Sequence, residues 1–353
     1  MNDSKVRTRG LKAVMAGFLF IALTTLALAL GSITLATWLD RPADSIPLEG
    51  ATFTVRSGDS AYAIARRLRE FGFIRSEPLF RVLLKARGLE QSLKAGVYEI
   101  RPDMSGSGVM DMIASGRQVL SRVSVPEGAG LDVVAAAAER AGIATAANFM
   151  SAAVDTALLT ELDIPETSFE GYLFPETYFL PFEAGAAALI RMMVATFRSR
   201  LAVLAPESTA LSPEELHRYV ILASVVEREY RVPEEAPLMA SVFWNRLRIG
   251  MALQSCATIV YVITERQGKP HPSRIYDRDL QIEDPFNTYR FPGLPPGPIS
   301  NPGPTALQAA FRPTASKYLY FRLVDEASGR HYFSETLDEH IKAASLAVKP
   351  RSQ

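Results

Sequence analysis

Two glutamates at the end of an apolar run are candidates for acid–base chemistry. The run Tyr219–Val226 carries no charge, and Glu227 and Glu229 follow it. Side chains three or four residues apart share a helix face, so Glu227 would continue the apolar stripe of Val220 and Ala223. A carboxyl held against apolar neighbours keeps its proton to higher pH, as a general acid for glycosidic-bond cleavage must. The same pattern also fits a helix end at which Glu227 faces water or pairs with an arginine.

The second glutamate points elsewhere. Glu229 lies two positions beyond Glu227, which is about 200° around a helix, so the two carboxyls should face different directions. We expect a supporting role at most for Glu229.

Composition argues against several other functions. Lys and Arg together number 38 and match 38 Asp and Glu, so the zero net charge does not suggest nucleic-acid binding. Cys256 is the only cysteine, which excludes an internal disulfide framework and a multi-cysteine metal site. The four histidines lack HExxH spacing. We therefore expect neither a metal nor a cofactor.

The N-terminal segment predicts a membrane anchor. Residues 1–12 carry Lys5, Arg7, Arg9 and Lys12, and Ala13–Leu39 contains no charged residue. That apolar run exceeds the ~20 residues needed to cross a bilayer and is longer than a signal-peptide core. Positive charge before the span predicts a single-pass protein of the inner membrane. Its N-terminus should be cytoplasmic, and the rest of the chain should lie in the periplasm.

Beyond the span, residues 40–50 read as a polar linker and residues 51–122 as a small module. A strand at Thr52–Val55, a Ser-Gly-Asp-Ser turn and a helix over Ala61–Phe71 open the module. This stretch, Thr52–Ile74, resembles the opening of a LysM module, a small peptidoglycan-binding fold. We interpret it as a LysM-like α+β module that either binds glycan or spaces the enzyme from the membrane.

Residues 123–347 are predicted to form a larger mixed α+β domain, followed by a tail at 348–353. Ser212-Pro213-Glu214-Glu215 is a strong helix start and launches the helix that carries Glu227. The aromatic segment Phe169–Tyr178 could be core or the wall of a sugar cleft. The proline-rich loop Pro292–Pro302 could be a site rim or a surface wrap. Strands at Tyr318–Leu323 and His331–Ser334 should pair, with a final helix at Leu337–Ala347.

Six segments in this order resemble the endolytic murein transglycosylases of the YceG-like (MltG) family. They read FEGYLFPETY, LASVVEREYRVPEEAPLMASVFWNRLRIGMALQS, NTYRFPGLPPGPISNPG, ALQAAFRP, KYLYF and HYFSETLDEH. The resemblance as a whole runs from about Val123 to Ala344. The resemblance implies a lytic transglycosylase that cuts peptidoglycan glycan strands internally between N-acetylmuramic acid and N-acetylglucosamine. It would leave 1,6-anhydro ends and thereby terminate strand elongation, in company with penicillin-binding proteins of the wall-synthesis complex.

The resemblance also implies roles for single residues. The first acid of the family's VE-x-E motif falls on Glu227, which would be the catalytic acid, with Glu229 supporting it. Candidate sugar contacts are Gln254, Ser255, Asn287, Thr288 and Tyr289, although hydrogen bonds that hold loops together are an equal alternative for them.

One position departs from the family. Where many members read QSDPT, this chain has Gln254-Ser255-Cys256-Ala257-Thr258, so Cys256 stands in the place of the aspartate. A cysteine nucleophile lacks a nearby histidine partner, and we expect a small buried thiol instead. Two alternatives stay open. One is a catalytically inactive peptidoglycan-binding scaffold, and the other is a muramidase that cleaves the same bond with water.

Overall fold

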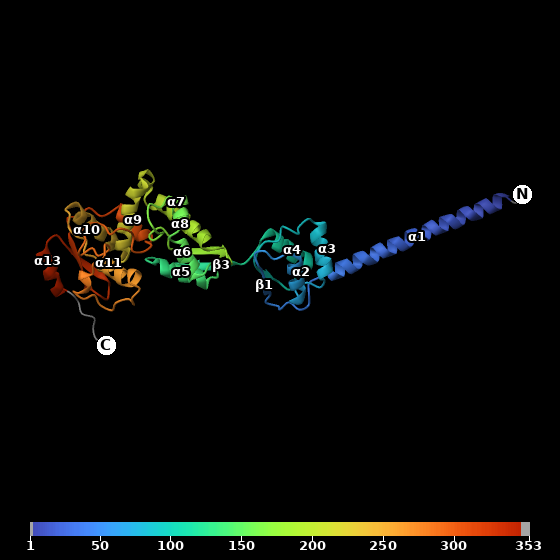
Figure 1. Cartoon of the computed structure of the whole chain (residues 1–353), viewed down its shortest axis with the longest axis horizontal. Helices are drawn as coiled ribbons and strands as arrows, with labels where there is room; N and C mark the ends of the chain where they lie inside the picture. Colours follow the sequence, from blue (N-terminus) through green and yellow to red (C-terminus); the bar gives the residue numbers. More distant parts are fainter. Residues whose placement is uncertain (1–2, 347–353) are drawn as a thin grey trace. The chain divides into compact units, whose positions relative to one another are not determined.

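The computed structural model describes residues 3–346, with side chains from residue 17 onward. The chain divides into two compact units between Leu120 and Ser121 (Figure 1). The predicted tail 348–353 and the last residue of the predicted final helix, Ala347, lie outside the described residues.

Unit 1 begins with a long apolar helix. Helix α1 spans Asp3–Leu39, and its part Gly17–Leu39 has a mean hydropathy of 2.2 with none of its surface buried. Its 23 residues are long and apolar enough to cross a membrane. Helix α1 begins ten residues before the predicted span, so it includes the basic segment ahead of Ala13.

The rest of unit 1 is a small α+β module. Strand β1 (Ala51–Val55) pairs antiparallel with β2 (Gly96–Ile100), with Phe53 opposite Tyr98. Alternate strand residues are buried on one face, as the period of two in a strand requires. The module's helices are α2 (Ala61–Glu70), α3 (Glu77–Ala86) and α4 (Gly106–Ser115). A second helix and a returning strand thus follow the opening that resembles LysM.

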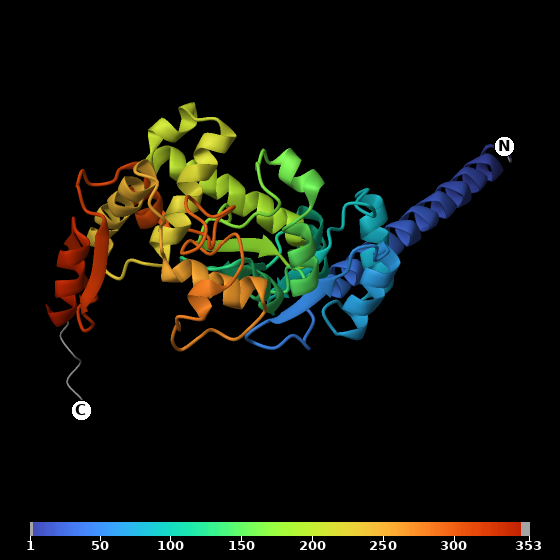
Figure 2. The same cartoon turned by 60° about the vertical axis from the view of Figure 1, so that its left-hand side comes forward.

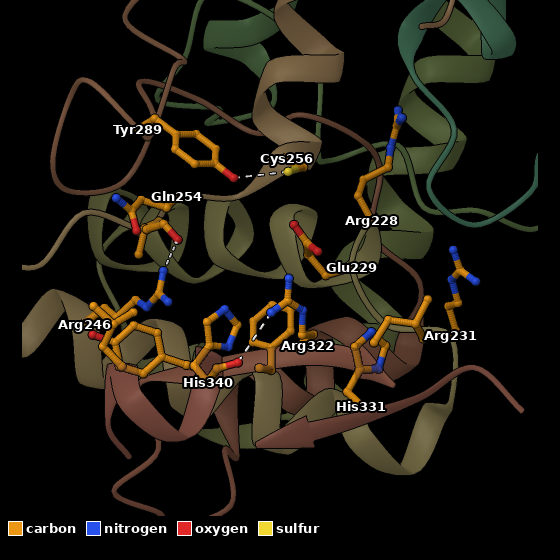
Figure 3. Close-up of a pocket in the computed structure, with 15 residues that line it drawn as sticks. Arg228, Glu229, Arg231, Arg246, Gln254, Cys256, Tyr289, Arg322, His331 and His340 are labelled. Atoms are coloured by element: carbon orange, nitrogen blue, oxygen red, sulfur yellow. Dashed lines mark hydrogen bonds between the residues drawn. The ribbon is translucent and has the colours of Figure 1, made fainter. Parts of the chain in front are cut away.

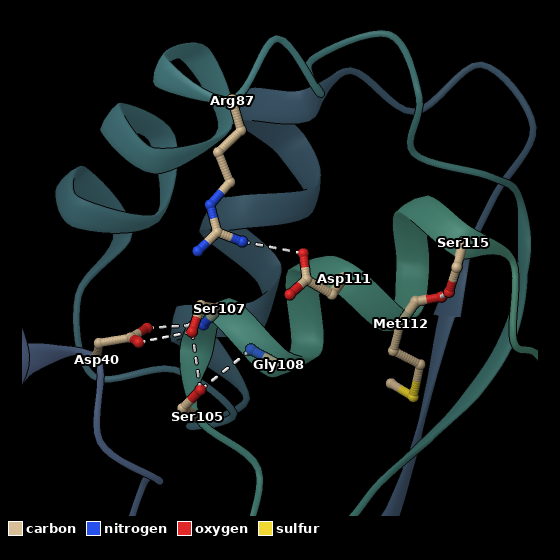
Figure 4. A network of polar contacts seen from close by, with 8 residues as sticks. All are labelled: Asp40, Arg87, Ser105, Ser107, Gly108, Asp111, Met112 and Ser115. Atoms are coloured by element: carbon tan, nitrogen blue, oxygen red, sulfur yellow. Dashed lines mark hydrogen bonds and ion pairs between the residues drawn. The ribbon is translucent and has the colours of Figure 1, made fainter.

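The predicted linker 40–50 is packed into this module. Ala43 and Ile46 are 8% and 7% exposed and belong to its hydrophobic core. Asp40, at the end of α1, accepts hydrogen bonds from the amide (2.7 Å) and the hydroxyl (2.6 Å) of Ser107, in the first turn of α4 (Figure 4). Arg75 donates to both carboxylate oxygens of Asp44, at 2.7 and 2.8 Å. The segment predicted as a polar linker is therefore packed against the module, because two of its apolar side chains are buried.

Unit 2 opens with a two-stranded sheet and helices around a large core. Strand β3 (Leu120–Ser124) pairs with β4 (Thr177–Pro181). The helices are α5 (Leu131–Arg140), α6 (Ala146–Ala152), α7 (Thr156–Glu161) and α8 (Ala186–Leu204). Phe169, Tyr172, Phe174 and Tyr178 are all buried in this core. The aromatic segment is core, not an open sugar-binding wall.

Helix α9 (Pro213–Glu227) forms the centre of unit 2 and packs against α10 (Ala236–Arg248) and α12 (Pro304–Phe311). Its start follows the sequence signal: Ser212 and Glu215 form a reciprocal capping box, with a proline in the first turn. Val220 and Ala223 are fully buried. The helix ends at Glu227, so Glu229 lies beyond it and helical geometry does not fix its direction.

The C-terminal part supplies a short helix, a hairpin and a last helix. Helix α11 (Cys256–Tyr261) continues into a π-helical turn, and β5 (Tyr320–Asp325) pairs antiparallel with β6 (Arg330–Ser334). Helix α13 (Leu337–Lys342) lies beside this hairpin (Figure 2).

The proline-rich loop before α12 is held against the body of unit 2. Asn301 is fully buried and accepts hydrogen bonds from the amides of Gly171 and Leu173, both at 2.9 Å. The amide of Ile299 donates to the Ser224 hydroxyl on α9 at 3.0 Å. Residues 292–303 therefore support α9 through these hydrogen bonds, and we call this segment the brace loop.

Candidate functional site

A pocket of about 670 Å³ lies within unit 2, between the end of α9 and the β5–β6 hairpin (Figure 3). Elements far apart in sequence form its walls, including α10, the turn before α11, the loop at Tyr289 and α13. Its lining residues are Arg228, Glu229, Arg231, Arg246, Leu253, Gln254, Cys256, Tyr289, Tyr320, Phe321, Arg322, Leu323, His331, Leu337 and His340.

Glu229 is the carboxylate in the pocket wall. The hydroxyl of Ser255 donates a hydrogen bond to its Oε1, and the amide of Ala257 also donates to the carboxylate. Burial raises the pKa of Glu229 above its ordinary value, which outweighs the lowering by these two donors and by the charge of Arg246. The pocket wall therefore contains a carboxyl whose neutral form is favoured by burial, and this carboxyl faces a space large enough for a ligand.

Glu227, the last residue of α9, does not line this pocket. Its Oε2 accepts a 2.9 Å hydrogen bond from the amide of Gly303, just before α12, and Tyr230 donates to its Oε1 at 3.4 Å. Burial raises the pKa of Glu227 to about 7, with the nearby Glu127 adding to the rise. The predicted apolar setting of Glu227 is present, but the carboxyl contacts the brace loop.

A polar network fixes the turn that supports Glu229. Ser255 is 3% exposed, and its amide donates to the Thr288 hydroxyl at 3.1 Å. The hydroxyls of Thr288 and Thr258 lie 2.9 Å apart, and the amide of Gln254 donates to the Thr288 carbonyl at 3.1 Å. Gln254 has a φ of +48°, in the left-handed region that non-glycine residues rarely adopt. This turn aims the Ser255 hydroxyl at Glu229.

The five predicted sugar contacts divide into two groups. Gln254 and Tyr289 line the pocket, whereas Ser255, Asn287 and Thr288 are buried beneath it. The side-chain amide of Asn287 donates to the carbonyls of Leu280 and Ile282, and its oxygen accepts from the amide of Tyr289. Ser255, Asn287 and Thr288 therefore form hydrogen bonds that hold the loops together, which is the alternative role predicted for them.

Cys256 is exposed at the pocket wall, contrary to the expected buried thiol. Its sulfur lies 3.1 Å from the Tyr289 hydroxyl, and partial burial raises the pKa of the thiol. A raised pKa disfavours the thiolate, so the geometry gives no support to a nucleophilic role.

The sequence did not predict the positively charged side of the pocket. Arg246, Arg322 and His340 come from α10, β5 and α13, and no local motif joins them. The one available signal was Arg246 itself, an arginine among the apolar residues of a buried helix; it is only 7% exposed. Among residues 17–346, no group of three or more His, Cys, Asp or Glu side chains is placed to hold a metal ion.

Comparisons with known proteins agree on one family. Residues 53–345 match the YceG-like family. An endolytic murein transglycosylase of Bacillus subtilis is 30% identical over 317 residues, covering 85% of each chain. One from Streptococcus pneumoniae is 27% identical over 331 residues, which are 85% of this chain and 58% of the pneumococcal protein.

A solved structure gives the same result. The crystal structure of a YceG-like protein of Listeria monocytogenes, at 2.6 Å, is 30% identical, with a TM-score of 0.56. The match covers 84% of this chain and 99% of that one. Since the family match covers most of the chain and includes both strands of the hairpin and the glutamate-bearing helix, this chain belongs to the YceG-like family.

Proposed function

We propose that this protein is a lytic transglycosylase that cuts peptidoglycan glycan strands, and that Glu229 is its general acid. The observation that carries the proposal is a carboxyl with a raised pKa in the wall of the pocket. The relatives named endolytic murein transglycosylase support the substrate class.

In the proposed reaction one carboxyl does both proton transfers. Glu229 gives its proton to the glycosidic oxygen between N-acetylmuramic acid and N-acetylglucosamine, and the bond from that oxygen to the muramic C1 breaks. The C6 hydroxyl of the same muramic residue then bonds to C1, and its proton returns to the Glu229 carboxylate. No water is consumed, and the product ends in 1,6-anhydro-muramic acid. A hydrolase generally needs a second carboxylate, whereas this intramolecular closure does not.

The choice of Glu229 over Glu227 rests on which carboxyl lines the pocket. Both carboxyls have a raised pKa, but only Glu229 lines the pocket. Glu227 is occupied by the amide of Gly303 and would act by holding the brace loop to the end of α9. The sequence-based prediction assigned the acid to Glu227 and expected its loss to be the greater one. The matched variants below distinguish the two assignments.

The experiment uses the full-length protein in detergent with purified peptidoglycan and mass analysis of the products. Wild type should give internal cuts that end in 1,6-anhydro-muramic acid. Glu229→Gln should lose about 10²–10⁴-fold in rate, the usual contribution of a general acid. Glu227→Gln should lose less. The reverse order would return the acid to Glu227.

The same digest tests the two alternative functions. Reducing ends, heavier by one water than anhydro ends, would identify a muramidase. A folded protein that cleaves nothing would favour the peptidoglycan-binding scaffold.

The proposed enzyme is anchored by α1 in the inner membrane, with a cytoplasmic N-terminus and periplasmic units 1 and 2. The exposed apolar helix Gly17–Leu39, preceded by basic residues, supports this placement. Detergent should be required to release the full chain from membranes, and release by salt alone would contradict the anchor. We assign the LysM-like module to spacing, and the partnership with penicillin-binding proteins rests on the family resemblance alone.

A further inference from the structure

Two arginines in one wall of the pocket form no ion pair. Arg246 and Arg322 both line it, and neither lies within ion-pair distance of a carboxylate in the part of the chain that the structure describes, although the charge of Arg246 acts on Glu229. A third arginine of the lining, Arg228, donates to the carbonyl of Ile299 at 3.4 Å. Arg231 lies 3.9 Å from Glu326, and His331 lies 2.8 Å from Glu235.

Arg246 is built into the wall. Its Nε donates to the carbonyl of Leu319 and one Nη to that of Leu253, both at 2.6 Å. Its guanidinium lies 5.2 Å from the centre of the Tyr320 ring. A 7% exposed arginine whose hydrogen bonds go to neutral carbonyls keeps its full charge at the edge of the cavity.

His340 lies between the two arginines along this wall (Figure 3). Burial and the charges of Arg322 and Arg246 lower the pKa of His340, so its ring is neutral near pH 7. Its Nδ1 is buried without a hydrogen-bond partner among the described residues, and its ring stacks on Tyr320. Arg322 reaches the carbonyl of His340 at 3.4 Å. The histidine therefore neither adds to nor cancels the charge of the arginines.

Glu229 is the one carboxylate in the pocket lining, and burial raises its pKa, which favours its neutral form. Two arginines that face the cavity without an ion-pair partner favour an anionic group on the ligand, since guanidinium binds carboxylates in a bidentate fork. We propose that Arg322 and Arg246 bind a carboxylate of the peptide that N-acetylmuramic acid carries. This inference rests on the proposed function.

The chemistry of the substrate selects this group. The sugar residues of a peptide-bearing strand carry no charge, because the lactyl carboxyl of muramic acid is bound in the amide that holds the peptide, whereas the peptide itself ends in carboxylates. The proposed cut is at the muramic residue itself, so its peptide lies beside the bond that Glu229 protonates. The enzyme would then prefer strands that still bear peptides.

The test compares two substrates in full-length protein: glycan strands with their peptides, and the same strands after their peptide carboxyls have been converted to neutral amides. The key variant is Arg322→Gln, because Arg322 is exposed and its loss does not open the core. Arg322→Lys keeps the charge and should rescue in part. Arg330→Gln removes a positive charge from the same hairpin but outside the pocket, and serves as the matched control.

For wild type, neutralising the peptide carboxyls should lower kcat/KM about tenfold or more, the size of one charge-assisted hydrogen bond. Arg322→Gln should lose about tenfold more on strands with free peptide carboxylates than on amidated ones, and Arg330→Gln should behave like wild type. Equal losses on both substrates, or a wild type indifferent to amidation, would overturn the proposal. A phosphate source is distinguished by adding strands with and without a lipid diphosphate end. Dependence on Arg322 only when that end is present would overturn the carboxylate assignment.

Binding separates this proposal from the reaction chemistry. In the Glu229→Gln background, Arg322→Gln should weaken the Kd for strands with free peptide carboxylates about tenfold and leave amidated strands much less affected. That pattern supports the carboxylate site even if no cleavage is found, and its absence overturns the site even if cleavage occurs.

Discussion

The Ser255 hydroxyl donates a hydrogen bond to the Glu229 carboxylate across 26 residues of sequence. Ser255 is itself fixed by Thr288, so a loop far along the chain sets the direction of the donor. A donor to the charged form of an acid stabilises that form, and here it moderates the rise in pKa that burial causes. The relationship links the turn before α11 directly to the proposed proton transfer.

Removing this donor should move the pH profile. In Ser255→Ala the pKa of Glu229 should rise further, because the contact that lowers it is gone. Activity that depends on protonated Glu229 falls as pH rises through this pKa, so the alkaline limb of kcat/KM should shift to higher pH. The measurement is the cleavage rate across pH 5–9, a range of about four units around the operating pH of a general acid. An unchanged alkaline limb would show that Glu229 is not the group that titrates.

Glu227 should make the folded protein less stable as pH rises. Its pKa is about 7 in the folded state against 4.5 ordinarily, so between these values the folded state holds a proton that the unfolded state has released. Stability therefore falls over this window, by on the order of 3 kcal/mol at 1.36 kcal/mol per unit. Glu227→Gln should match wild type near pH 4 and exceed it at pH 8 in urea unfolding. Glu214→Gln, exposed on the same helix, is the control and should leave the slope unchanged.

The single thiol offers a chemical probe of the pocket. Cys256 is exposed in the pocket wall, so alkylation by N-ethylmaleimide should place a bulky group there and block cleavage. Since the raised pKa disfavours the thiolate, labelling should be slow at neutral pH and faster at higher pH. Cys256→Ser should resist inactivation by the reagent. Full labelling with full activity would show that the substrate does not use this pocket.

The packed segment 40–50 should be resistant to proteases. Asp40→Ala removes two hydrogen bonds to the first turn of α4 and should cost about 1–2 kcal/mol, as the loss of a capping carboxylate does. Limited proteolysis should then cut the segment faster. Asp44→Ala is the matched control. Its carboxylate is 88% exposed in its pair with Arg75, so its loss should have a small effect. Rapid cleavage of the wild type here would contradict the packing.

Local signals predicted most of the elements. The capping box at Ser212, the proline-led start of α9 and the hairpin β5–β6 rest on residues close in sequence, and the structure has them. Strand β4 was missed, because Thr177–Pro181 is short and begins inside an aromatic segment that reads as core. The resemblance to a family predicted more of the fold than the residue patterns did, because six segments together specify a fold that no single segment specifies.

The site could be predicted only in part. Helical periodicity distinguishes Glu227 from Glu229 only while the helix lasts, and α9 ends at Glu227. The direction of Glu229 depends on Ser255 and on the hairpin, which no local rule relates to it. The basic wall of the pocket combines side chains from α10, β5 and α13, so its charge is visible only when the chain is folded.

The packing of residues 40–50 also bears on where the proposed enzyme can work. As a free tether, these eleven residues would extend up to about 36 Å and let the module sample a wide volume above its anchor. Because Asp40, Ala43 and Ile46 hold the segment against the module, it does not allow this range of movement. If α1 spans the membrane as proposed, the module of unit 1 then stays near the bilayer surface, where its local concentration is higher than a free tether would allow.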